Sequence, residues 1–323
     1  MHIAAQNFVS SQVSSFEWYV FNFFDSVVRW GVPVFVMISG ALFLERDFPI
    51  RKIFSKNILR LVVSYVIWGA IYAFIDGGGI SDIFAKTFRG HYHMWFIPMI
   101  IGIYICVPIL KKIVESEQIA KYFLTLSFVF VFALPWFMQV AVVFGGSPFT
   151  VINNIYKNLY GKMHLELIAG YPAYFILGHM LSKSEFNKKA RIFIYVMGIV
   201  GAISTMVFCY VSSVKNPTLD EFFYGNLTLN VLAESVAVFV FFKYNSLKSA
   251  KIGKIVGKLS TYSFGVYLIH ALVIEFLDKQ FGLNTLSFNP ILAVPCIAVI
   301  VCVVAFTASW ILNRIPILNK YIV

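Results

Sequence analysis

Residues 192–211 read IFIYVMGIVGAISTMVFCYV, a run that contains no charged side chain. A helix of about twenty residues rises about 30 Å, which is the thickness of the hydrocarbon core of a bilayer. The strands of a membrane barrel would alternate apolar and polar residues, and this run does not alternate. The stretch therefore predicts a helix that spans a membrane.

The rest of the chain has the same character. Of its 323 residues 59% are hydrophobic and only 13% are charged, against about 25% charged residues in an ordinary soluble domain. Comparable apolar runs lie near residues 27–45, 58–75, 94–110, 121–144, 165–181, 192–212, 227–242, 259–277 and 290–312. We therefore expect an all-α, polytopic membrane bundle of about nine spans that forms a single domain over residues 1–323.

The net charge of +11 does not indicate a nucleic-acid partner, because the basic residues follow a membrane topology. Most of the 26 Lys and Arg residues lie in the loops after the first, third, fifth and seventh predicted spans and at the C-terminus. The positive-inside rule places these segments in the cytoplasm. We thus expect a protein of the inner (plasma) membrane with a cytoplasmic C-terminus. Residues 1–26 would then lie outside without forming a complete span, so we expect a further helix before Met1 and ten spans in all.

Few residues inside the apolar runs could carry chemistry. An ionisable side chain at the bilayer centre costs about 2.5–3.5 kcal/mol on insertion scales, so its presence needs a reason. His270 lies in YSFGVYLIHALVIEFL, and Tyr267, three residues earlier, shares its helix face. The alternative hypothesis, equally open, is that His270 is neutral and only forms a hydrogen bond with a neighbouring helix. We expect Glu275 at the membrane interface and His91 in solvent.

Lys56 and Arg60 begin the second predicted span, four residues apart and thus on one helix face. They either extend to lipid headgroups or bind an anion such as the phosphates of coenzyme A. The sequence contains no P-loop, GxGxxG, HExxH or GxSxG pattern, so ATP-driven transport, dinucleotide redox chemistry and serine hydrolysis lack support. We expect no bound metal.

Five strings, read in order over nearly the whole chain, carry a family resemblance. They are VPVFVMISG (32–40), KNILR (56–60), YHMWF (92–96) with YICVP (104–108), YFILG (174–178) and SFGVYLIH (263–270). Together they resemble acyltransferase family three, the bacterial multi-spanning membrane acyltransferases, and in particular its O-acetyltransferases of surface polysaccharides. The resemblance implies transfer of an acyl group from cytoplasmic acetyl-coenzyme A to a hydroxyl of a glycan or lipid-linked sugar.

The resemblance also implies roles for individual residues. His2 falls where the family has a histidine near the outer end of its first helix, and it would be the catalytic base. Lys56 and Arg60 would bind the donor phosphates, although the first arginine of the family's Arg-x-x-Arg is Asn57 here. The residues that would line the cavity or contact the acceptor are Ser39, His93, Trp95, Tyr267 and His270. A belt of aromatic residues at the interface would account for Trp95 equally well.

Two other functions fit a bundle of this kind. A polysaccharide exporter or other transporter shares the architecture, although the sequence shows no matched pair of broken helices in two halves. The unrelated membrane-bound O-acyltransferases also place a histidine in an apolar helix, but the five ordered strings favour family three. Release of free coenzyme A distinguishes an acyltransferase from a transporter.

Overall fold

The computed structural model describes residues 1–163, 166–215, 218–245 and 249–321, and every regular element within them is helical. Among these described residues, seven helices are long and apolar enough to cross a membrane, or eight if a bent pair is counted as one span. The expected all-α polytopic bundle is confirmed, and the expected count of nine is approximate. Residues 165–181 were expected to span, and the helix there, α11 (Glu166–Lys183), is broken at Gly170 by a non-helical backbone.

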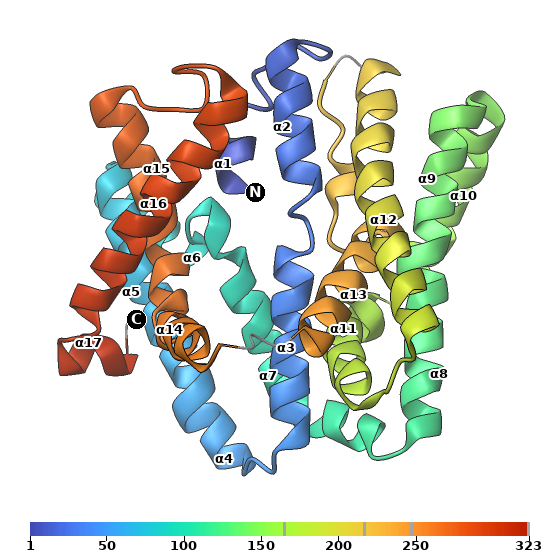
Figure 1. Cartoon of the computed structure of the whole chain (residues 1–323), viewed down its shortest axis with the longest axis horizontal. Helices are drawn as coiled ribbons and strands as arrows, with labels where there is room; N and C mark the ends of the chain where they lie inside the picture. The colour runs from blue at the N-terminus through green and yellow to red at the C-terminus, as the bar shows by residue number, and fades with distance from the viewer. Residues whose placement is uncertain (164–165, 216–217, 246–248, 322–323) are drawn as a thin grey trace. The chain divides into compact units, whose positions relative to one another are not determined.

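The contacts between helices divide the chain into two compact units. The first contains residues 1, 3–47 and 107–246, and the second contains residues 2, 48–106 and 247–323. Figure 1 shows the helices of both.

The first unit is built around two closely packed helix pairs, α3 with α11 and α12 with α13. Its elements are α1 (His2–Ala5, without His2 itself), α2 (Phe16–Ser26), α3 (Gly31–Glu45), the end of α7 (Phe96–Val114), α8 (Glu117–Ser127), the π-helix η3 (Phe128–Ala133), α9 (Leu134–Gly145), α10 (Ser147–Met163), α11, α12 (Lys188–Lys215), the 3₁₀-helix η4 (Phe222–Tyr224) and α13 (Leu229–Tyr244). The sequence did not predict α10, which lies beside α9 (Figure 1).

Glycine allows α3 and α11 to approach closely. A Cβ atom on Gly40 would lie 1.8 Å from the carbonyl oxygen of Phe175, and one on Gly178 would lie 2.0 Å from that of Met37. Both distances are far below van der Waals contact, so any side chain would force the helices apart. Small residues commonly bring membrane helices together in this way. Two of the family strings, which end at Gly40 and Gly178, therefore encode one helix-helix contact.

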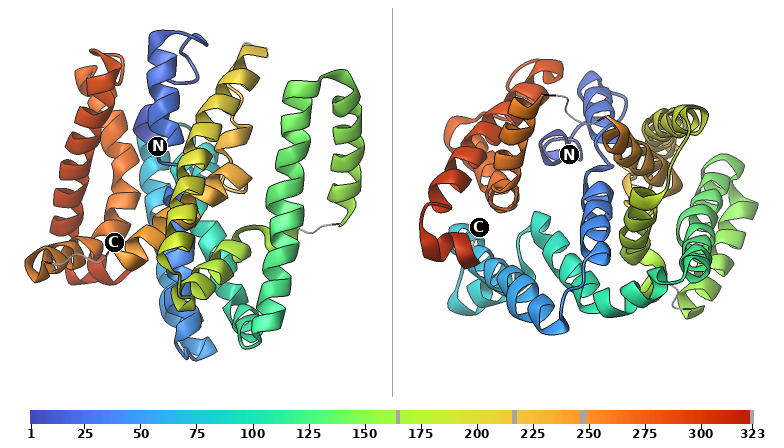
Figure 2. Two further views of the ribbon diagram at one scale, coloured as in Figure 1. Left: turned by 45° about the vertical axis from the view of Figure 1, so that its right-hand side comes forward. Right: turned by 60° about the horizontal axis from the view of Figure 1, so that its bottom comes forward.

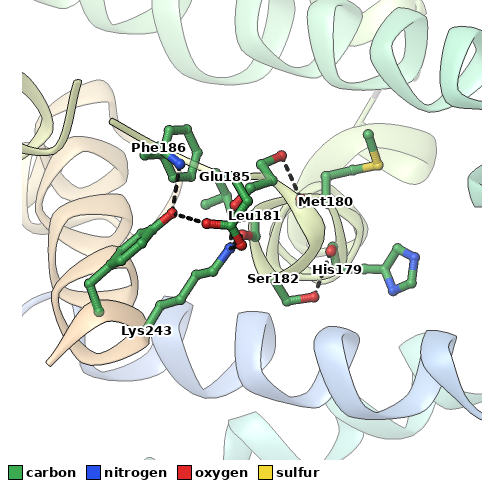
Figure 3. Close-up of polar contacts among 9 residues, drawn as sticks. His179, Met180, Leu181, Ser182, Glu185, Phe186 and Lys243 are labelled. Atoms are coloured by element: carbon green, nitrogen blue, oxygen red, sulfur yellow. Dashed lines mark hydrogen bonds and ion pairs between the residues drawn. The ribbon is translucent and has the colours of Figure 1, made fainter. Parts of the chain in front are cut away.

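A lysine from α13 completes the C-terminal end of α11. The ammonium of Lys243 donates to the carbonyl oxygen of Leu181 at 3.1 Å (Figure 3) and also to that of Ser184. The last carbonyls of a helix have no partner within it, and a cation also suits the negative end of the helix dipole. The His179 ring points away from this group (Figure 3). Lys243 thus links α13 to the end of α11.

The second unit contains four of the histidines of the chain. Its elements are α4 (Ile50–Lys52), the π-helix η1 (Ile53–Ile58), α5 (Leu59–Asp76), α6 (Ile80–Arg89), the 3₁₀-helix η2 (Tyr92–Trp95), most of α7, α14 (Ala250–Ser260), α15 (Ser263–Phe281), α16 (Pro290–Leu312) and α17 (Pro316–Tyr321). Within it α5 packs against α6 and α17, and α15 packs against α16 (Figure 2). Helices α14 and α15 meet at a bend of 64°.

Tyr72 joins α5 to α15 in this unit. Its hydroxyl donates to the carbonyl oxygen of Leu268 at 2.8 Å and accepts from the amide of Leu272 at 3.1 Å. Tyr72 is 2% exposed, so the hydroxyl is satisfied entirely by the neighbouring helix. This contact fixes the position of His270, which lies between the two backbone groups along α15.

Candidate active site: a histidine cluster

Four histidines that are distant in the sequence meet in the second unit. His2 comes from α1, His91 directly precedes η2, His93 lies in η2 and His270 lies in α15. The ring centroid of His270 is 5.1 Å from that of His2 and 5.0 Å from that of His93, and His91 lies 5.2 Å from His93. We call these four residues the histidine cluster.

Hydrogen bonds hold three of the imidazoles in place. His91 Nε2 lies 2.8 Å from Glu275 Oε1, and His91 Nδ1 lies 3.0 Å from His93 Nδ1. His270 Nδ1 lies 2.6 Å from the carbonyl oxygen of Tyr267. The Tyr267 hydroxyl in turn donates to the carbonyl oxygen of His93 at 2.7 Å. The cluster is therefore built by α15 and η2 together.

One interpretation of the sequence was wrong here. His91 was expected in solvent, but its side chain is only 11% exposed, and Tyr72 stacks on its ring at 4.2 Å. Glu275, expected at the membrane interface, is the hydrogen-bond partner of His91, and its place at the interface stays a prediction. Nothing in the local sequence joins the two residues, and their contact depends on how α15 lies against the segment before η2.

The cluster suits proton transfer. Imidazole is the side chain that most readily gains and loses a proton near neutral pH. Among the described residues no group of three or more His, Cys, Asp or Glu side chains could hold a metal ion. The imidazoles of the cluster can act as acids and bases.

The residues expected to line the acceptor cavity are only partly brought together. His93, Tyr267 and His270 lie with His2, whereas Trp95 is 41% exposed and its ring contacts Phe96. Ser39 belongs to the first unit, where its hydroxyl donates to the carbonyl oxygen of Phe35, one turn earlier in the same helix.

A basic cavity of about 660 Å³ lies elsewhere in the second unit. Its lining consists of Arg60, Lys258, Thr261, Tyr262, Trp310, Asn313, Arg314 and Asn319. Three cations and two carboxamides around one hollow form a site suited to phosphate groups. We call it the basic cavity.

Only one of the two residues expected to bind the donor lines the basic cavity. Arg60 does so, whereas Lys56 is exposed on η1. Lys56 belongs to the π-helix η1, whereas Arg60 lies in α5 just after the end of η1. The donor-binding role of either residue stays a prediction.

Lys258 and Arg314 were missed as candidate site residues. Both were interpreted only as cytoplasmic charges that set the topology, and nothing in the sequence joins them to Arg60. The contacts of α17 with α5, together with those of α15 with α16, place them in one unit. The Arg314 guanidinium lies over the Trp310 ring at 3.9 Å, which fixes its direction.

A second set of buried polar residues lies in the first unit and was also missed. Asp25 and Arg29 form an ion pair one helical turn apart, and the guanidinium lies 4.1 Å from the ring centre of Tyr224. Glu234, which is 3% exposed, accepts a hydrogen bond from Thr205 at 2.9 Å. The signal in the sequence was the presence of charged residues inside apolar runs. We call these five residues the buried polar network.

Comparison with known proteins places these observations in a family. A model of acyltransferase family three, described as an acyltransferase domain, matches residues 1–314. A Staphylococcus aureus (strain MSSA476) protein named "Probable poly-beta-1,6-N-acetyl-D-glucosamine export protein" is 20% identical over 275 residues, which cover 81% of this chain and 75% of that protein. No solved structure matches the chain.

A viral relative carries a name of a different kind. The "Putative acetyltransferase ORF330" of Acidianus two-tailed virus is 23% identical over 265 residues, which cover 76% of this chain and 73% of that protein. The family model extends over almost the whole chain, through the histidine cluster and the basic cavity. This chain therefore belongs to acyltransferase family three and is a membrane acyltransferase.

Proposed function

We propose that this chain transfers an acetyl group from acetyl-coenzyme A to a hydroxyl of a cell-surface polysaccharide or of a lipid-linked sugar. The observation that carries the proposal is the presence in one unit of a histidine cluster for proton transfer and a basic cavity for phosphates. The membership of the family supports acyl transfer, and the name of the viral relative supports the acetyl group.

The basic cavity is our candidate for the donor site. Coenzyme A carries phosphates, and Arg60, Lys258 and Arg314 present three positive charges to one hollow. Lys56, exposed on η1, contributes to the approach of the donor rather than to the lining of the cavity. We place the protein in the inner (plasma) membrane, with the basic cavity and the C-terminus on the cytoplasmic side. The distribution of the basic residues along the chain supports that orientation.

The histidine cluster is our candidate for the reacting end. An imidazole takes the proton of the acceptor hydroxyl while the oxygen attacks the thioester carbonyl, and the sulfur of coenzyme A leaves and is protonated. The resemblance supplies His2 as this base, and its ring contacts those of His93 and His270. Membrane lipid surrounds the helices, and a lipid-linked acceptor would approach from it.

Turnover by purified protein tests the proposal. The protein in lipid vesicles is given acetyl-coenzyme A and an oligosaccharide of N-acetylglucosamine, and free thiol is measured together with the acetyl content of the sugar. We expect thiol and new O-acetyl esters in equal amounts. Thiol release without acetylation of any offered sugar would contradict the acceptor class, and no thiol release at all would contradict acyl transfer.

Export is the second candidate, favoured by one observation, the printed name of the Staphylococcus aureus relatives. Vesicles that contain the protein and an enclosed radiolabelled oligosaccharide test it directly. Movement of unmodified sugar across the membrane without thioester consumption would favour export over acyl transfer.

A further inference from the structure

The hydrogen bonds of His91 and His93 determine which ring nitrogen carries each proton. A carboxylate only accepts hydrogen bonds, so His91 Nε2, 2.8 Å from Glu275 Oε1, is the N–H donor of that contact. In a neutral imidazole the other nitrogen is then an acceptor. His91 Nδ1 thus accepts, and His93 Nδ1, 3.0 Å away, must be the donor.

The same reasoning leaves His93 Nε2 without a proton. This atom is buried and makes no hydrogen bond of normal geometry within the described part of the chain, although the backbone of Leu268 interacts with the ring. His93 as a whole is 1% exposed. A buried acceptor without a donor destabilises the folded state, because the nitrogen has lost its hydrogen bond to water. The site therefore retains an unsatisfied, proton-accepting nitrogen within the histidine cluster, where the proposed function requires a base.

Neutral His91 is needed for this arrangement, since an imidazolium would donate from both nitrogens and reverse the tautomer of His93. Burial lowers the pKa of His91, and the negative charge of Glu275 opposes this shift without reversing it. Tyr72, stacked on His91 at 4.2 Å and in edge contact with His93 at 5.3 Å, restricts both rings. The geometry and the charge state are consistent.

We propose that Glu275 and His91 are positioning residues that hold His93 as its Nδ1–H tautomer and keep Nε2 available as the proton acceptor for acyl transfer. The inference rests on the proposed function and revises one part of it, because it assigns the proton acceptor to His93 Nε2 rather than to His2, which the resemblance offers. His2, whose ring centroid is 6.4 Å from that of His93, would then orient the acceptor hydroxyl. It is supported by the sequence of contacts from Glu275 Oε1 to His91 and from His91 Nδ1 to His93 Nδ1.

Acyl transfer with His93 Nε2 as the proton acceptor breaks an O–H bond and a C–S bond and forms a C–O bond and an S–H bond. The acceptor O–H bond breaks, and its proton passes to His93 Nε2 while the oxygen forms a bond to the thioester carbonyl carbon. The C–S bond breaks, and the thiolate of coenzyme A takes the proton from the imidazolium. His93 returns to its neutral form, and Glu275 stabilises the positive charge through His91 while it exists.

Nitrogen NMR of the imidazoles tests the tautomers without any substrate. Protein labelled with ¹⁵N-histidine is measured in lipid vesicles, and the signals are assigned by their loss in His93→Gln and His91→Phe. We expect a protonated Nδ1 and a bare Nε2 for His93, and the reverse for His91. A protonated Nε2 on His93 would overturn the inference whatever the protein's activity.

Kinetics test the role of these residues in the reaction. Glu275→Gln removes the charge at nearly constant shape, and His91→Phe retains a ring against Tyr72 while removing both nitrogens. We expect each to lower kcat about 100-fold with the KM for acetyl-coenzyme A unchanged, whereas a merely structural role would change stability and expression. Asp82→Asn is the matched control, because it makes the same chemical change in the Asp82–Lys86 ion pair of α6.

The outcomes separate the two proposals. Wild-type turnover together with unchanged kcat in Glu275→Gln and His91→Phe would overturn the positioning role and leave the proposed function intact. No turnover by the wild type would overturn the proposed function itself, and the catalytic part of this inference with it.

Discussion

The buried polar network of the first unit and the histidine cluster of the second both hold ionisable side chains away from water, but they do so in different ways. In the network the Arg29 guanidinium faces the carboxylate of Asp25, four residues earlier in the chain, and an aromatic ring from η4, so charges are compensated inside the protein. In the cluster the groups are imidazoles, whose neutral forms need no counter-charge. The comparison indicates that the network stabilises the bundle, whereas the cluster retains groups that exchange protons.

His2→Gln is expected to have the largest effect. It removes an imidazole that contacts His270 at 5.1 Å between ring centres. We expect a loss of about 10³-fold in acetyl-coenzyme A turnover with little change in the unfolding temperature. Turnover and thermal unfolding of the same preparation measure both. If activity and stability were lost together, His2 would stabilise the fold as the buried polar network does, and the proposed difference between cluster and network would be contradicted.

Asp25→Ala should show the opposite pattern. It leaves the guanidinium of Arg29 without its carboxylate inside the span Phe16–Glu45, and removal of one partner of a buried ion pair costs about 3 kcal/mol or more. We expect a clearly lower unfolding temperature in detergent, with turnover per folded molecule within a few-fold of wild type. A stable but inactive variant would instead assign the network to the chemistry.

Lys258→Met and Arg314→Met examine the basic cavity, the other polar region of the second unit. Each removes one of its three cations, and we expect the KM for acetyl-coenzyme A to rise about tenfold, which corresponds to about 1.4 kcal/mol, while kcat stays near wild type. The same comparison with acetyl-pantetheine, which lacks the nucleotide phosphates, is the control. An equal rise in KM for both donors would show that the cavity does not bind those phosphates.

Thr205→Val should have the smallest effect. The substitution preserves shape and removes a hydroxyl that lies 2.9 Å from Glu234 Oε1 and from the carbonyl oxygen of Gly201 and accepts from Asn230 Nδ2 at 2.7 Å. Hydrogen bonds between membrane helices contribute about 0.6 kcal/mol on average. We expect a slight decrease in the unfolding temperature, measured beside Asp25→Ala, and unchanged turnover. A loss as large as that of Asp25→Ala would mean that the network acts as a single unit.

The sequence predicted the bundle well, because apolar runs of span length follow directly from the thickness of the bilayer. It did not predict α6 or α14, since their mixed polar and apolar residues form no long run. Nor did it predict α10, which follows α9 after a single residue, Gly146, at φ +75°. Short or amphipathic helices are stabilised by packing on their neighbours, which no local pattern reports.

The candidate site was predictable only in part. His270 and Tyr267 were recognised because their spacing places them on one helix face, and His2 was recognised through the resemblance. The pairing of Glu275 with His91 could not be predicted, because it joins residues far apart in the chain. The same is true of Arg60, Lys258 and Arg314, whose common cavity depends on how α5, α14 and the end of α16 pack.

The O-acetyl content of surface glycans, measured by NMR, tests the central claim most directly. Cells whose native copy is replaced by this protein are compared with cells that carry the His2→Gln variant, at equal amounts of protein in the membrane. We expect acetylated glycans in the first and loss of the acetyl groups in the second. Glycans that are equally acetylated in both would contradict a catalytic role for the histidine cluster at His2, and glycans that are unacetylated in both would contradict acetyl transfer.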